Sequence, residues 1–363
     1  MPIFSVDSNI PMLIPILEKV GTVYSFANGE ITNEQLITNK TEFLIVRSTI
    51  KVNENLLKGT NVKFVGTVTT GVEHIALDYL QKNGIKFASA AGSNSNSVAE
   101  YVIYSILLWF HQTVQIDNNN IGIIGFGNIG TKVAKYLENM QLEYCVNDPI
   151  VKKDKNIKRN YQNLNFVSLD KIIKNCNVIT THVPLTTEGK YKTLNLLDAK
   201  RIKQIKPNSL IICTSRGGVC DEKAMLARKD DLNFIVDVWE NEPYVNNREL
   251  IDISLLATPH IAGHSFHGKL KGTLMIAAIL NEIYNFNLDL SEIFSIIKER
   301  KLLNPNDIQD FNKLFNSLTE ERKLMETSLK MKEKSNLSAE EFKNYFEFER
   351  ANYPKLSEIL YLD

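Results

Sequence analysis

Cysteine is scarce in this chain and shows no pattern typical of a metal centre. The 363 residues include four cysteines, Cys145, Cys176, Cys213 and Cys220, and no two of them have a CxxC or other metal-ligand spacing. Each lies in or beside an apolar run, so we expect small buried side chains in a reducing compartment. The sequence therefore predicts no bound metal.

The chain also has no excess of positive or negative charge, and it has no long apolar segment. Lys and Arg (42) balance Asp and Glu (42), so the overall charge favours neither nucleic acid nor a membrane surface as a partner. The apolar part of residues 98–112 is too short to span a bilayer and includes Glu100, so we expect a core helix. The first residues show no signal-peptide pattern, and we expect a cytoplasmic protein whose anionic ligands are bound by local cations.

The chain is rich in short apolar runs that alternate with helical patterns. Residues 3–90 contain five such runs, IFSV, TVYSF, EFLIVR, VKFVGT and IKFASA, with helix-like segments between most of them. One helix is predicted to begin at a capping box, because Thr32 and Gln35 have the required spacing. This alternation predicts a small α/β domain with a parallel sheet.

A second α/β unit follows. Ser97 and Glu100 have capping-box spacing, which predicts a helix that opens at Ser97 and runs to about His111. From Ile121 onward, apolar runs again alternate with helical patterns. After Gly268 a helical segment is expected to return the chain to the first domain, and the remainder is mainly helical. We therefore expect three domains, residues 1–96 with a return segment at about 268–288, residues 97–267, and residues 289–363.

A glycine-rich fingerprint opens the second unit. Gly125, Gly127 and Gly130 form GxGxxG between the apolar run IGII and a helical pattern, which is the context that dinucleotide-binding turns require. The backbone of this turn, including Asn128 and Ile129, is expected to face the pyrophosphate. Asp148 ends the next apolar run, about 20 residues further on, where a carboxylate binds ribose hydroxyls and disfavours a 2′-phosphate. The cofactor is therefore expected to be NAD.

Three chemically competent side chains follow later apolar runs. Arg216, Glu242 and His260 come just after SLIICTS, FIVDV and LLAT, and ligands bind outside the carboxyl ends of parallel strands. Taken singly, they could be a surface ion-pair residue, a turn residue and a core histidine. Together they suit hydride transfer on a 2-hydroxy acid, with His260 as the base, Glu242 orienting it, and Arg216 holding the carboxylate.

At this point the residues resemble a known family, the D-isomer-specific 2-hydroxyacid dehydrogenases. The resemblance covers nearly the whole chain and rests on GFGNIG, Asp148, THVPLT, SRGG, DVWENEP and TPHIAG. It implies active-site roles for Arg216, Glu242 and His260. It also implies NAD contacts at Asp148, Asp237 and Gly263, and substrate contacts at Ser48 and Thr69.

The loops that hold the implied substrate contacts support such a role by themselves. Ser48 and Thr69 lie in VRSTIK and GTVTTG, which follow apolar runs of the first domain and offer hydroxyl and backbone donors to a phosphate or carboxylate. Arg47 could add a charge. Two positions depart from the family pattern. Val183 stands where a Thr often contacts NAD, and His264 stands where a substrate-binding Tyr is common.

The fold expected is two Rossmann-like or flavodoxin-like parallel-sheet domains with an active-site cleft between them, plus a mainly helical C-terminal domain. Within the family, the resemblance implies NAD-dependent oxidation of 4-phospho-D-erythronate in pyridoxal 5′-phosphate (vitamin B6) biosynthesis, by a homodimer that associates through residues 289–363. Two alternatives remain. One is another D-2-hydroxyacid dehydrogenase, acting on 3-phosphoglycerate, lactate or glyoxylate-type compounds. The other is a non-catalytic NAD-binding regulator of the same fold.

Overall fold

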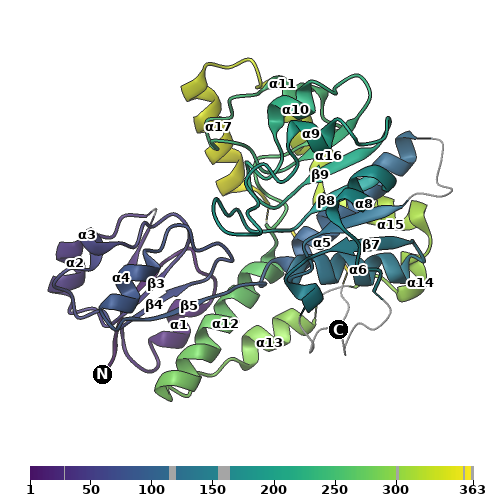
Figure 1. Ribbon diagram of the computed structural model, residues 1–363. Helices are drawn as coiled ribbons and strands as arrows, with labels where there is room; N and C mark the ends of the chain where they lie inside the picture. The colour runs from purple at the N-terminus through teal and green to yellow at the C-terminus, as the bar shows by residue number, and fades with distance from the viewer. Residues whose placement is uncertain (28, 114–119, 154–163, 300–301, 355, 361–363) are drawn as a thin grey trace. The chain divides into compact units, whose positions relative to one another are not determined.

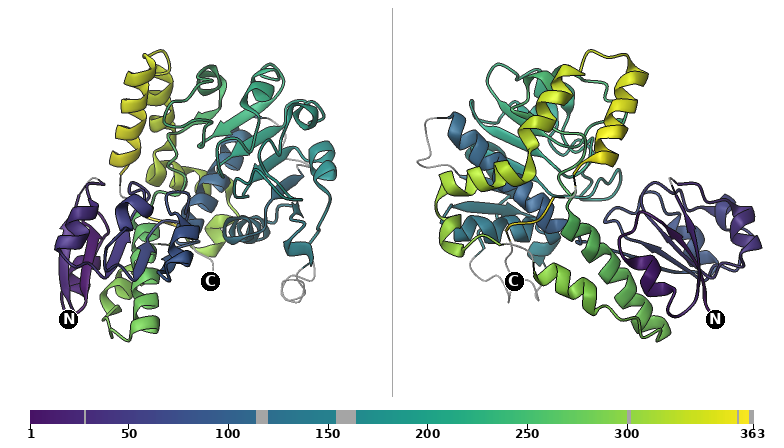
Figure 2. Two further views of the ribbon diagram at one scale, coloured as in Figure 1. Left: turned by 60° about the vertical axis from the view of Figure 1, so that its left-hand side comes forward. Right: turned by 180° about the vertical axis from the view of Figure 1, so that it is seen from behind.

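Two compact units make up the chain. The computed structural model describes residues 1–27, 29–113, 120–153, 164–299, 302–354 and 356–360. The first unit comprises Met1–Asn94 and Ser265–Lys301, and the second comprises Ser95–His264 and Leu302–Asp363. Figures 1 and 2 show both units in ribbon form.

The first unit is a parallel α/β sheet. Its described strands follow the order β2-β1-β3-β4-β5 and all pair in parallel. The strands are β1 (Ile3–Asp7), β2 (Thr22–Phe26), β3 (Phe43–Val46), β4 (Phe64–Thr67) and β5 (Lys86–Ser89). The helices are α1 (Leu13–Leu17), α2 (Asn33–Thr38), α3 (Glu54–Leu57), α4 (Leu77–Lys82), α12 (Phe266–Tyr284) and α13 (Ser291–Lys298). The capping box at Thr32 and Gln35 is confirmed.

Both faces of this sheet are buried, which explains why its strands read as continuous apolar runs. Side chains alternate along a strand, so Phe43 and Ile45 pack against α1, α12 and α13. Leu44 and Val46 point the other way, into a core with α2, α3 and α4. A fully buried side chain of this kind contributes roughly 1.5–3 kcal/mol relative to an exposed one.

The second unit has the same topology with one more strand. Its order is β11-β10-β9-β8-β6-β7, again parallel throughout the described residues. The strands are β6 (Ile121–Ile124), β7 (Tyr144–Asn147), β8 (Val178–Thr181), β9 (Leu210–Cys213), β10 (Asn233–Val236) and β11 (Leu256–Ala257). The helices that precede the return to the first unit are α5 (Ser95–Gln112), α6 (Asn128–Asn139), the 3₁₀ turn η1 (Val151–Lys153), α8 (Leu169–Asn175), α9 (Ala199–Ile202), α10 (Glu222–Leu226) and α11 (Glu249–Ile253).

In both sheets the strand order reverses beside the first strand. The reversal lies between β1 and β3 in the first unit and between β6 and β8 in the second. Loops that leave the carboxyl ends of such neighbouring strands in opposite directions open a crevice where ligands bind. The topology therefore places the turn after β6, which carries the glycine fingerprint, at a ligand-binding position.

The C-terminal helices join the second unit, which differs from the separate domain expected over residues 289–363. They are α14 (Pro305–Ile308), α15 (Phe311–Arg322), α16 (Leu324–Glu333) and α17 (Ala339–Asn352), whereas α13 belongs to the first unit. Leu314 and Leu318 of α15 are fully buried in one core with α5 and α6. Phe342 and Phe346 of α17 are buried in the core on the other face of the same sheet.

The capping box expected at Ser97 is wrong. Helix α5 begins two residues earlier, at Ser95, so Ser97 and Glu100 both lie inside the helix. Both side chains are fully buried and bind groups from distant parts of the chain. Tertiary contacts have thus overridden a local signal.

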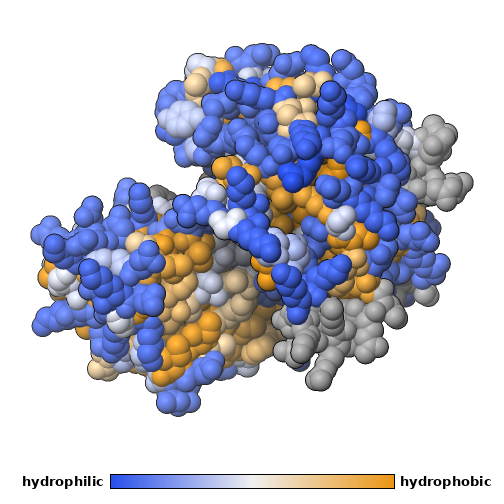
Figure 3. Space-filling view, in the orientation of Figure 1, coloured by the Kyte–Doolittle hydropathy of each residue, from blue (hydrophilic) through white to orange (hydrophobic). Residues whose placement is uncertain are grey.

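The surface is mainly hydrophilic on the face of each unit drawn in Figure 3, with smaller hydrophobic patches. No helix within the described ranges is both long and apolar enough to cross a membrane.

Candidate active site

The glycine fingerprint forms a tight turn between β6 and α6. Gly125 has a φ of 95°, and a Cβ at this position would lie 2.4 Å from the carbonyl oxygen of His182, so only glycine fits. A Cβ at Gly127, which caps α6, would meet nothing within 4 Å, so this part of the turn is open to a bound group. Asn128, Ile129 and Gly130 follow in the first turn of the helix, whose N–H groups have no partner within the helix. These residues fit a pyrophosphate.

Asp148 lies directly after β7 and ties two turns together. Its Oδ2 accepts a hydrogen bond from the backbone N–H of Phe126 (2.9 Å), inside the glycine fingerprint. Its Oδ1 accepts from the N–H groups of Ile150 (3.0 Å) and Val151 (2.9 Å). A carboxylate has about four acceptor sites, so these contacts leave room for further donors such as ribose hydroxyls.

The end of β8 packs against the glycine turn. Val183 lies so close that its Cγ1 would be 2.9 Å from a Cβ at Gly125. Burial lowers the pKa of the neighbouring His182 to about 3, and its Nε2 lies 3.0 Å from Oγ1 of Thr180. This side of the cofactor turn is therefore apolar and uncharged.

Glu242 and His260 are in direct contact. Oε1 of Glu242 lies in hydrogen-bond contact with Nδ1 of His260, and both side chains remain about a quarter exposed, at 23% and 24%. Burial alone would raise the pKa of Glu242, but attraction to His260 and their hydrogen bond, with smaller effects from Arg350 and the Trp239 N–H, lower it overall. The pair therefore combines an ionised carboxylate with an imidazole whose Nε2 is not used in the contact.

Asp237 holds the loop that carries His260. Its Oδ1 accepts hydrogen bonds from the Thr258 hydroxyl (2.6 Å) and the Ile261 N–H (2.7 Å), and its Oδ2 accepts from the Ala262 N–H (3.0 Å). Asp237 is 1% exposed, and burial raises its pKa against the opposing effect of His260. The loop needs this support because His260 has a φ of 56°, which non-glycine residues seldom adopt.

Thr258 is part of this support, although no pattern in the sequence singled it out. Its hydroxyl also lies 2.7 Å from the hydroxyl of Tyr101 in α5, and its carbonyl accepts from the indole N–H of Trp239 (2.9 Å). Thr258 lies within TPHIAG, but the pattern by itself does not tell that its hydroxyl reaches a carboxylate twenty-one residues earlier.

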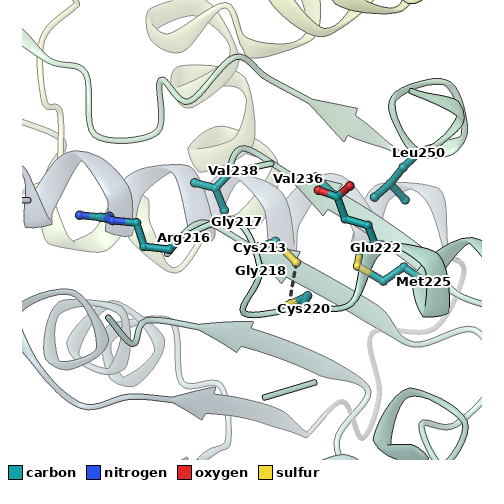
Figure 4. Close-up of a pocket in the computed structure, with 10 residues that line it drawn as sticks. All are labelled: Cys213, Arg216, Gly217, Gly218, Cys220, Glu222, Met225, Val236, Val238 and Leu250. Carbon is teal, nitrogen blue, oxygen red and sulfur yellow. Dashed lines mark hydrogen bonds between the residues drawn. The ribbon is translucent and has the colours of Figure 1, made fainter. Parts of the chain in front are cut away.

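Arg216 follows β9 in a loop that packs against the loop after β10. A Cβ at Gly217 would lie 2.0 Å from the carbonyl oxygen of Trp239, so the close approach of the two loops requires glycine. The Nη1 group of Arg216 donates to the carbonyl of Ser215 (2.8 Å). Figure 4 shows the guanidinium directed away from the small cavity that Cys213 and Cys220 line.

The cysteines are free thiols, and three of the four are buried. The sulfur atoms of Cys213 and Cys220 are 3.1 Å apart, and those of Cys145, which is half-buried, and Cys176 are 3.5 Å apart. Among the described residues, no group of three or more His, Cys, Asp or Glu side chains is arranged to hold a metal ion.

The remaining expected substrate contacts divide between the units. In the first unit, Arg47 follows β3 and its Nε donates to Oδ2 of the buried Asp7 (2.9 Å), which ends β1. Ser48 is exposed, and Oγ1 of Thr69 lies 2.8 Å from the hydroxyl of Thr67. This cluster lies where the order of the first sheet reverses.

His264 belongs to the second unit. Its N–H donates to the carbonyl of Ile261 (2.8 Å), and its ring centroid is 6.3 Å from that of Tyr353. Gly263 lies between His264 and Ala262, whose N–H is held by Asp237. The second unit thus places His264, His260 and Glu242 on loops that share the same supports.

Comparison with known proteins agrees with this arrangement. The family model described as "D-isomer specific 2-hydroxyacid dehydrogenase, NAD binding domain" matches residues 109–262. The chain is 38% identical over 285 residues to the erythronate-4-phosphate dehydrogenase of Wigglesworthia glossinidia brevipalpis, which is 77% of this chain and 72% of that protein. It is 41% identical over 276 residues to the enzyme of the same name from Marinomonas sp. (strain MWYL1), which is 74% of this chain and 70% of that protein.

Solved structures share the fold. The NAD⁺-bound 3-phosphoglycerate dehydrogenase of Entamoeba histolytica has a TM-score of 0.63 and 23% identity, and the match covers 79% of this chain and 97% of that one. The glycine turn and Asp148 fit the NAD-binding domain that the family model describes. The chain therefore belongs to the D-isomer-specific 2-hydroxyacid dehydrogenase family and is an NAD-dependent 2-hydroxyacid dehydrogenase.

Proposed function

We propose that this enzyme oxidises 4-phospho-D-erythronate to (R)-3-hydroxy-2-oxo-4-phosphooxybutanoate with NAD, in pyridoxal 5′-phosphate biosynthesis. The support for this substrate is that relatives 36–41% identical over 74–79% of this chain carry the name erythronate-4-phosphate dehydrogenase. The observation that carries the mechanism is the contact between His260 and Glu242.

In this mechanism His260 is the base. Its Nδ1 faces Glu242, so Nε2 is the nitrogen that takes the proton from the C2 hydroxyl of the substrate. The ionised carboxylate of Glu242 orients the ring and stabilises the imidazolium that forms. When bound, NAD supplies the acceptor for the hydride that leaves C2.

The other residues proposed for the site bind and orient the substrate and NAD. Arg216 holds the substrate carboxylate, because its planar guanidinium can pair with both oxygens and polarise the developing carbonyl. The substrate contacts proposed are Arg47, Ser48 and Thr69, in the first unit, and His264, in the second. The NAD contacts proposed are Gly125, Gly127, Asn128, Ile129, Gly130, Asp148, Val183, Asp237 and Gly263. Val183 contributes only an apolar surface, since it has no side-chain donor or acceptor.

A substrate panel tests this function. Purified enzyme is assayed for NADH formation with 4-phospho-D-erythronate, 3-phosphoglycerate, D-lactate and glycerate, and His260→Ala is the matched control for background reduction. We expect the highest kcat/KM with 4-phospho-D-erythronate. A higher value with another acid would reassign the substrate, and no turnover of any of them, with NAD still bound, would favour the non-catalytic regulator.

We also propose that the enzyme is a cytoplasmic homodimer. Leu314 and Leu318, two apolar residues of the segment expected to form the dimer contact, are buried in their own unit and are not available for it. Exposed apolar side chains on neighbouring helices do, namely Leu329 of α16 (55% exposed) and Phe348 of α17 (62% exposed). Light scattering after size exclusion tests this: a dimer is expected for the wild type, and a monomer for Leu329→Glu/Phe348→Glu if these residues form the interface.

A further inference from the structure

A buried polar cluster joins the C-terminal helices to the start of α5. Arg322, at the end of α15, has no exposed surface, and neither have Ser97 and Glu100 of α5. Nη1 of Arg322 donates to the Ser97 hydroxyl (2.9 Å) and lies 3.4 Å from Oε2 of Glu100. Oε1 of Glu100 accepts from the N–H of Leu360 (2.6 Å), so the chain end is tied to the same cluster. A buried guanidinium is costly unless such partners satisfy it.

The cluster reaches the loop that carries His260. Nη2 of Arg322 donates to the carbonyl oxygen of Ala262 (3.1 Å), and the Ser97 hydroxyl donates to the same oxygen (2.8 Å). The N–H of Ala262 is bound by Asp237. The residue two positions after His260 is therefore held on both sides, by Asp237 through its N–H and by Arg322 and Ser97 through its carbonyl.

We propose that Arg322 is a positioning residue for the reaction, and that it acts by fixing the loop that holds His260 through the Ala262 carbonyl. The C-terminal helices thus complete the active-site loop of their own chain. This inference rests on the proposed role of His260 as the base. Reaction rates depend steeply on such placement, since a displacement of about 1 Å in a reacting group can cost roughly 10²-fold in rate.

Among the residues that hold the loop carrying His260, Arg322 is the one supplied by the C-terminal helices. His260 has a left-handed backbone conformation, which persists only where the surroundings fix it. Asp237 directly follows β10 of the same unit, whereas Arg322 lies 60 positions after Ala262 in the chain. Tyr353 strengthens this attachment, because its hydroxyl donates to the carbonyl of Arg322 and its ring lies beside that of His264.

The test compares Arg322→Met with Arg248→Met. Arg248 is a matched control because it also anchors the C-terminal part, by donating to the carbonyls of Ser335 (3.1 Å) and Leu337 and lying over the Phe342 ring. It also donates to the carbonyl of Val245 (3.3 Å), three residues after Glu242, but it makes no hydrogen bond to Asp237, Thr258 or Ala262. For each variant we would measure the melting temperature and, by fluorescence, the Kd for NAD. We would also measure kcat, KM and the pH profile of kcat with the 2-hydroxy acid that the wild type oxidises best.

Both variants should melt at a lower temperature. Only Arg322→Met should lower kcat, by roughly 10- to 100-fold at a temperature where it is folded, with the Kd for NAD within about twofold of wild type. Its pH profile should also change, because His260 meets Glu242 less often. If Arg322→Met fails to fold, Arg322→Lys replaces it. Lysine keeps one charged donor toward Ala262, so a smaller loss of kcat, about 3- to 10-fold, is expected.

A double variant tests whether Arg322 acts through His260. In a His260→Ala background the Arg322 substitution should cause no further loss of kcat, because residues that act as a unit are non-additive. A full additional loss would overturn the proposal, as would a folded Arg322→Met or Arg322→Lys enzyme with wild-type kcat, or equal losses in Arg248→Met. Failure of the proposed base is distinguishable, since His260→Ala would then itself retain wild-type kcat.

Discussion

His260 and Glu242 meet through the ring nitrogen Nδ1 and the carboxylate oxygen Oε1, on loops that leave neighbouring parallel strands. Because the contact uses Nδ1, Nε2 is the ring nitrogen left for the substrate. The contact also places the negative charge of Glu242 beside the ring. The lowered pKa of Glu242 favours the ionised carboxylate. A neutral amide in its place would keep the shape and remove the charge.

Glu242→Gln should therefore lower kcat by roughly 10²-fold or more, because the imidazolium formed in the reaction loses its counter-ion. The carboxylate also faces the ring before the reaction begins, so its loss should change the pH dependence of the rate as well. The rising limb of kcat/KM in the oxidation direction should therefore shift. Steady-state rates over a pH series measure this, and a drop in kcat with an unmoved profile would argue that Glu242 only shapes the loop.

Cofactor choice depends on Asp148. Asp148→Asn should weaken the binding of NAD by about 10-fold. It should also reduce the enzyme's preference for NAD over NADP, because a neutral side chain no longer repels a 2′-phosphate. The asparagine retains an oxygen for the N–H groups of Ile150 and Val151, so the turn is kept. The measurement is the dissociation constant of NAD and of NADP for the wild type and for Asp148→Asn. If neither constant changes, Asp148 supports the two turns that it joins and does not bind the cofactor.

Stability should depend on pH through the buried cluster around Arg322. Burial raises the pKa of Glu100 from 4.5 to about 8, although Arg322 opposes this. Between these values the folded protein holds a proton that the unfolded chain has released, so the free energy of unfolding should fall as the pH rises toward 8. In Glu100→Gln this contribution to the fall in the free energy of unfolding should be absent.

Urea unfolding of the wild type and Glu100→Gln at about pH 5 and about pH 8.5 measures the effect. Burial also raises the pKa of Glu222, to about 7, and that group contributes a decline to both proteins equally. The difference between the two proteins therefore reports Glu100 together with the effect of the nearby Glu358 on it. Parallel curves would show that the Glu100 carboxyl titrates as it does in the unfolded chain.

The strands, and the positions of Arg216, Glu242 and His260 beyond strand ends, could be predicted from the sequence because their signals are local. Buried parallel strands appear in the sequence as apolar runs, and Arg216, Glu242 and His260 could be placed because each lies in the loop after one. The glycine fingerprint is equally local. These parts of the fold follow from residues that are neighbours in the chain.

The destination of the C-terminal helices could not be predicted in the same way. An amphipathic helix shows which of its faces is buried but not what covers it, so Leu314 suited a dimer interface as well as the core it enters. Ser97 and Glu100 have the spacing of a capping box, yet their partners include Arg322 and Leu360, more than 220 positions away. Such contacts leave no pattern in a local stretch of sequence.

Substrate recognition should depend on pH through His264. If His264 binds the phosphorylated acid, its protonated form should hold the dianion better through a charge-assisted hydrogen bond. KM should then rise as the imidazolium is lost with increasing pH, separately from the effect of His260 on kcat. His264→Tyr should flatten this dependence and preserve turnover, because a phenol stays neutral over the same range and still donates a hydrogen bond. The neighbouring ring of Tyr353 offers an aromatic contact to either side chain. The measurement is KM against pH for both proteins, corrected for the ionisation of the substrate phosphate. Superimposable curves would leave Arg47, Ser48 and Thr69 as the phosphate ligands and His264 without a part in binding.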